Sequence, residues 1–125
     1  MKQSIIEVSN IAAEDLFSWC FDSVIGHGGD GTAAICCDNY QEAFEMFKKW
    51  AIDNNAEYLT TTCKAQKLED TIILHDNNEN YIFTKDCNLN LFEGDYVFIV
   101  RGDCPSWNSN NPVIKSIKRN ENGQS

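Results

Sequence analysis

The stretch GHGGDGTAAICCDNYQEAF, residues 26–44, contains the signals that decide the fold. It begins with four of the chain's seven glycines, which favour the end of a preceding helix. TAAICC is a short apolar run typical of a buried strand. Asn39, followed three residues later by Glu42, forms a variant of the capping box, and apolar residues then recur at helical spacing. The stretch therefore predicts a helix end, a strand and a second helix in succession.

The residues before this stretch predict a strand and a first helix. QSIIEV, residues 3–8, is typical of a short strand, and Asn10 offers a cap for a helix over Ile11–Ile25 that Gly26 ends. This helix is apolar except for a narrow stripe through Asp15, Ser18 and Asp22. So wide an apolar surface indicates burial on more than one side, or a homodimer interface through this helix.

After the second helix the apolar period changes from 3.6 to two, which predicts strands. DNNE, between TIILH and NYIFTK, is a hairpin signal. We expect a single α+β domain over residues 1–118, with two helices packed on a mixed or mostly antiparallel sheet, and a disordered tail over 119–125. A crossover through the first helix would make the sheet mixed. The strands expected in this half are 56–63, 71–75, 80–85, one ending near Gly102, and 113–118.

The charge distribution is the most informative feature for function. The chain has 19 acidic and 10 basic residues, and the 45 residues from Gln3 to Phe47 include no lysine or arginine. A field of one sign repels nucleic acid and anionic membranes and attracts basic proteins. We therefore expect a basic protein partner, with no direct nucleic-acid or membrane binding. A solvated acidic face that only maintains solubility is the alternative.

Neither a membrane span nor a secretory signal is apparent, which favours the cytoplasm. No run of 18 apolar residues occurs, and the N-terminus has no uninterrupted apolar block after a positive start. The six cysteines include no C-x-x-C pair and are expected to be buried free thiols. Adjacent Cys36 and Cys37 should point to opposite faces of a strand.

No motif predicts a catalytic residue, metal or cofactor. His27 or His75 beside a thiol would be a Cys/His nucleophile pair, but two histidines and six cysteines place some pair together by chance. His27, Asp30, His75 and Asp76 lack the ligand density of a metal site. The glycine-rich loop follows a helix and precedes a strand, which reverses the order found in phosphate-binding loops. We interpret it as a connection between two elements.

Three functions from different classes remain. The first is a small acidic protein that inhibits a basic partner such as a nuclease or nucleic-acid-binding defence enzyme, in the manner of immunity or phage anti-defence proteins. The second is a protein that binds or sequesters a nucleotide-like signal, and the third is a Cys/His enzyme. The residues expected to bind the protein partner are Glu14, Asp15, Asp22, Asp38, Glu42 and Glu45. The candidate ligand-binding residues are His27, Gly28, Gly29, Asp30, Arg101 and Trp107.

Overall fold

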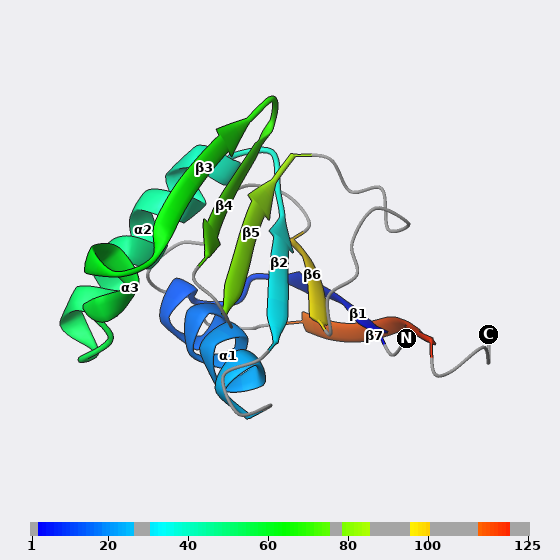
Figure 1. The fold of residues 1–125 in the computed structure, drawn as a ribbon. Helices are drawn as coiled ribbons and strands as arrows, with labels where there is room; N and C mark the ends of the chain where they lie inside the picture. The colour runs from blue at the N-terminus through cyan, green and yellow to red at the C-terminus, as the bar shows by residue number, and fades with distance from the viewer. Residues whose placement is uncertain (1–2, 27–30, 76–78, 86–95, 101–112, 121–125) are drawn as a thin grey trace.

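A seven-stranded mixed sheet with helices on one face forms the molecule, as a computed structural model shows (Figure 1). The structure describes residues 3–26, 31–75, 79–85, 96–100 and 113–120. The α+β class with a mixed sheet is as predicted. In chain order the elements are β1 (Gln3–Ser9), α1 (Ala13–Ile25), β2 (Thr32–Cys36), α2 (Tyr40–Asp53), α3 (Tyr58–Thr61), β3 (Lys64–Leu68), β4 (Thr71–His75), β5 (Asn80–Thr84), β6 (Tyr96–Val100) and β7 (Val113–Asn120).

The strand order is β3-β4-β5-β2-β6-β1-β7. The four central strands, β5, β2, β6 and β1, are parallel, and β4, β3 and β7 add antiparallel pairs at the two sides. β2 and β6 are buried along nearly their whole length, which explains why their sequences are continuous apolar runs. β3 is an exposed edge strand, and Lys64 and Lys67 on it discourage pairing with another chain.

α1 and α2 pack on the same face of the sheet, where they form the main core (Figure 1). Aromatic rings dominate the contact between the helices. Phe17 of α1 meets Phe47 of α2 edge to face at 5.4 Å between ring centroids, and Phe44 and Phe47 continue onto Phe83 of β5. Each such pair contributes about 0.5–1.5 kcal/mol beyond the area that it buries.

The opposite face of the central strands carries a second, smaller buried cluster. Cys37 belongs to the helix-side core and Cys36 to this second cluster, so the two thiols point to opposite faces as predicted. No described helix contributes to the second cluster, whose members are Ile5, Ala34, Cys36, Val97 and Ile99.

The predicted start of the first helix was wrong. α1 begins at Ala13, and its N-cap, Ala12, makes no side-chain cap hydrogen bond. Asn10 adopts a left-handed conformation (φ 54°), so it forms a turn after β1 instead of a cap. Gly26 ends the helix as predicted. Its backbone is right-handed (φ −61°), so the preference for glycine here is steric: a Cβ at this position would lie 2.9 Å from the carbonyl oxygen of Asp22.

The capping box of the second helix is not formed as predicted. Asn39 makes no side-chain bond to the backbone of α2; its amide donates to the Glu42 carboxylate at 3.4 Å.

At the other end of the chain, β7 extends through Asn120, two residues beyond the domain limit expected at 118.

A strand predicted over 56–63 is instead the short helix α3, and the strand begins at Lys64. The threonine hydroxyls of this segment bond to carbonyls three and four residues back, as from Thr60 to Glu57 at 2.8 Å and from Thr62 to Tyr58 at 2.6 Å. These local bonds and the burial of Leu59 outweigh the strand preference of threonine.

Candidate acidic interface

The six acidic residues expected to bind a partner are all exposed on the helical side of the molecule. Asp15 and Glu14 lie in the first turn of α1, and Asp22 lies in its last turn. Asp38 precedes α2, and Glu42 and Glu45 lie near its start. Two groups are defined here: the α1 acids are Glu14, Asp15 and Asp22, and the α2 acids are Asp38, Glu42 and Glu45.

The α2 acids are partly engaged with their own helix. Glu45 forms an ion pair with Lys48 at 3.1 Å, and Glu42 accepts the bond from Asn39. Exposed pairs of this kind contribute about 0–1 kcal/mol, so they leave the carboxylates available to a stronger partner.

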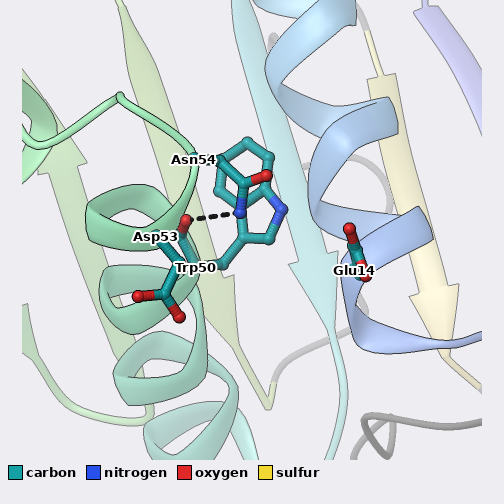
Figure 2. Close-up of a pocket in the computed structure, with 4 residues that line it drawn as sticks. All are labelled: Glu14, Trp50, Asp53 and Asn54. Carbon is teal, nitrogen blue, oxygen red and sulfur yellow. Dashed lines mark hydrogen bonds between the residues drawn. The ribbon is translucent and has the colours of Figure 1, made fainter.

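A hollow of about 270 Å³ lies between α1 and the C-terminal end of α2. The described residues that line it are Glu14, Trp50, Asp53 and Asn54, and none of them is basic. In Figure 2, Glu14 of α1 lies across from the Trp50 indole, whereas the Asp53 carboxylate lies on the other side of Trp50 and is turned away from α1. We call this feature the interhelical hollow. Asp53 lies eleven residues after Glu42 and eight after Glu45. Because a helix rises about 1.5 Å per residue, Asp53 is about 16 Å from Glu42 and about 12 Å from Glu45 along the helix.

Trp50 forms the buried wall of the interhelical hollow. Its side chain is 4% exposed, stacks on Phe47 with ring centroids 5.6 Å apart, and meets Phe21 edge to face at 5.7 Å. The indole nitrogen lies on the edge of the ring turned toward α1 (Figure 2), and this buried N–H has no hydrogen-bond partner among the described residues. A buried donor without an acceptor costs about 1–3 kcal/mol.

The electrostatics of the hollow favour a cation. Glu14 and Asp53 are both exposed, and no ion pair to either is found in the part of the chain that the structure describes. The last turn of α2 contains no basic residue, so the negative end of its dipole is not neutralised within the helix. The Asn54 side-chain amide donates to the Trp50 carbonyl at 2.8 Å and fixes this end of the helix (Figure 2). The hollow therefore offers two carboxylates and one N–H donor.

Buried titratable groups elsewhere serve the core. Cys20, Cys36, Cys37 and Cys63 are buried thiols, as expected for these four. Burial raises the pKa of the Cys20 thiol well above its ordinary value, so Cys20 stays protonated at neutral pH and is a poor nucleophile.

Glu79 connects α3 to β5. One of its carboxylate oxygens accepts bonds from the Tyr58 hydroxyl at 2.8 Å and the Tyr81 hydroxyl at 2.9 Å. Burial, followed by the bond to Glu79, raises the pKa of Tyr81 far above its ordinary range. Both tyrosines donate to the carboxylate, which is an arrangement that holds a short helix in place.

The predicted ligand-binding residues cannot be placed. His27, Gly28, Gly29, Asp30, Arg101 and Trp107 lie outside the described residues, as do Asp76, Cys87 and Cys104. His75 is half-buried on β4. Within the described ranges, no three His, Cys, Asp or Glu side chains gather as a metal site, and no helix is long and apolar enough to cross a membrane.

Sequence reasoning missed the interhelical hollow. Trp50 is one of the apolar residues that recur at helical spacing after Glu42, and no motif in the sequence marks Trp50 or Asp53 as part of a site. The one available signal was an aspartate three residues after a tryptophan at the end of an amphipathic helix, and this does not indicate which other helix faces them.

No protein-family model matches the chain, and no curated protein or solved structure matches it either.

Proposed function

We propose that this protein binds a basic protein partner through the acidic side of α1 and α2 and thereby inhibits it. The observation that supports this most directly is that all six acidic residues are exposed, five of them on α1 and α2 and Asp38 just before α2, where the two helices cover one face of the sheet. The chain has no lysine or arginine between Lys2 and Lys48, so little positive charge from the same segment opposes them. Carboxylates arranged in this way compete with the phosphates that a nuclease or nucleic-acid-binding enzyme holds in its groove.

The interhelical hollow itself does not suit a nucleotide-like ligand, and the residues expected to bind such a ligand lie outside the described residues. Two carboxylates repel phosphate, and a volume of about 270 Å³ is smaller than the roughly 300–1,000 Å³ of pockets that enclose small molecules. The basic partner is therefore the function that we put forward.

The experiment compares three variants that each lose three negative charges. One neutralises the α1 acids, one the α2 acids, and a matched control neutralises Glu57, Glu69 and Asp70, which are exposed outside both groups. The partner is isolated from the source cells on the immobilised protein, purified, and titrated against each variant by calorimetry.

We expect the α1 or α2 variant to weaken binding at least about tenfold, the control less than about threefold, and the wild-type complex to block nucleic-acid binding by the partner. Equal binding by all variants to each isolated partner would contradict the proposal.

A further inference from the structure

The interhelical hollow has the features of a site for a single cationic side chain. It combines an acidic pair from two helices with an independent observation, the Trp50 N–H, which is buried, turned toward α1 and without an acceptor. The acidic pair calls for a cation, and the indole calls for a hydrogen-bond acceptor beside it. A basic peptide segment provides both, because its side chain carries the charge and its main chain carries carbonyl oxygens.

We propose that the interhelical hollow binds the guanidinium group of an arginine from the basic partner, while Trp50 donates its N–H to a main-chain carbonyl of the same segment. This inference rests on the proposed function and specifies which group of the partner is recognised. It makes Glu14, Trp50 and Asp53 the specificity-determining residues of the acidic interface.

Arginine fits this site better than lysine because the carboxylates belong to different walls. Glu14 belongs to α1, whereas Asp53 belongs to α2 (Figure 2). A guanidinium has five donors in one plane and bonds to two carboxylates at once, whereas an ammonium is a compact point charge. The size of the hollow, about 270 Å³, also suits one side chain better than a larger ligand.

Phe47 and Phe21 hold the indole in a fixed orientation. A donor that is already oriented loses little conformational freedom when an acceptor arrives. The two carboxylates, by contrast, are exposed in the free protein and adjust to the incoming group.

The test titrates the ¹⁵N-labelled protein with N-acetyl-arginine amide and, in parallel, with N-acetyl-citrulline amide, which has the same shape but no charge. The indole N–H signals are followed by NMR, and W50F identifies the Trp50 signal among those of the three tryptophans. The double variant E14Q/D53N removes the carboxylates of the hollow. The matched control E69Q/D70N removes the same charge at two exposed positions outside the hollow and outside the α1 and α2 acids.

We expect the arginine probe to move the Trp50 signal saturably in wild type. The citrulline probe, and the arginine probe with the E14Q/D53N variant, should bind at least about tenfold more weakly, whereas E69Q/D70N should bind the arginine probe within about twofold of wild type. An unmoved Trp50 signal, or an equal loss in E69Q/D70N, would overturn the proposal. A partner that binds E14Q/D53N normally yet fails with the α1 or α2 variant would disprove the arginine site alone. Arginine binding without any basic partner would disprove the proposed function alone.

Discussion

At the scale of single residues, this chain separates carboxylates that hold the fold from those that face solvent. Glu79 is 7% exposed and its oxygen is shared by two tyrosine hydroxyls, so it belongs to the structure. Glu14 and Asp53 are exposed beside an indole N–H that has no acceptor in the part of the chain that the structure describes. The difference in hydrogen bonding, more than the charge itself, identifies the second pair as available to a partner.

Two buried groups, Cys20 and Tyr81, make stability depend on alkaline pH. Both have pKa values raised in the folded state, chiefly by burial. In the unfolded chain a cysteine ionises near pH 8.5 and a tyrosine near pH 10. Above those values the unfolded state binds fewer protons than the folded state, so the free energy of unfolding falls as pH rises. Each group contributes a slope of up to about 1.4 kcal/mol per pH unit.

The measurement is urea denaturation from pH 7 to 11 of wild type, Cys20→Ala and Tyr81→Phe. We expect the Cys20→Ala curve to decline less steeply from about pH 8.5 upward, and the Tyr81→Phe curve to diverge from wild type only above about pH 10. Curves parallel to that of wild type over the whole range would show that these groups are not responsible.

At the scale of elements, the sequence predicted most strands and both long helices but not their contacts. The strand β2, the β4–β5 hairpin and the start of α2 follow from period, turn residues and apolar spacing, which are local properties. The segment 56–63 was misassigned because the buried Leu59 and the Tyr58–Glu79 bond, which hold it as a helix, depend on tertiary contacts. The acidic residues were identifiable from the sequence, whereas the hollow required the crossing of α1 over the end of α2.

The two ends of α1 should respond oppositely to loss of charge. Asp15 lies in the first turn, where the helix dipole favours an acid, while Asp22 lies in the last turn, which has no basic residue. We expect Asp15→Asn to lower the free energy of unfolding by about 0.3–1 kcal/mol and Asp22→Asn to raise it by a similar amount. Urea denaturation at low salt measures both.

This pair distinguishes a role in binding from a role in stability. An acid retained where it destabilises its own helix is readily explained by a function outside the fold. If Asp22→Asn instead lowers stability as much as Asp15→Asn does, Asp22 has a structural role that the dipole argument omits.

At the scale of the whole molecule, the net charge of −9 should make the folded state sensitive to ionic strength. Self-repulsion destabilises a compact chain of one sign, and the screening length falls from about 30 Å at 0.01 M salt to about 8 Å at 0.15 M. Stability should therefore rise with sodium chloride, by on the order of 1 kcal/mol between these concentrations.

Two single charge reversals at exposed positions, Asp22→Lys on α1 and Lys64→Glu on β3, shift the net charge in opposite directions. We expect a smaller salt gain than wild type for the first and a larger one for the second, as measured by thermal unfolding in a series of salt concentrations. An equal gain for both variants would mean that salt acts through local pairs rather than through the field of the whole protein, and that the acidic side carries no long-range steering of a basic partner.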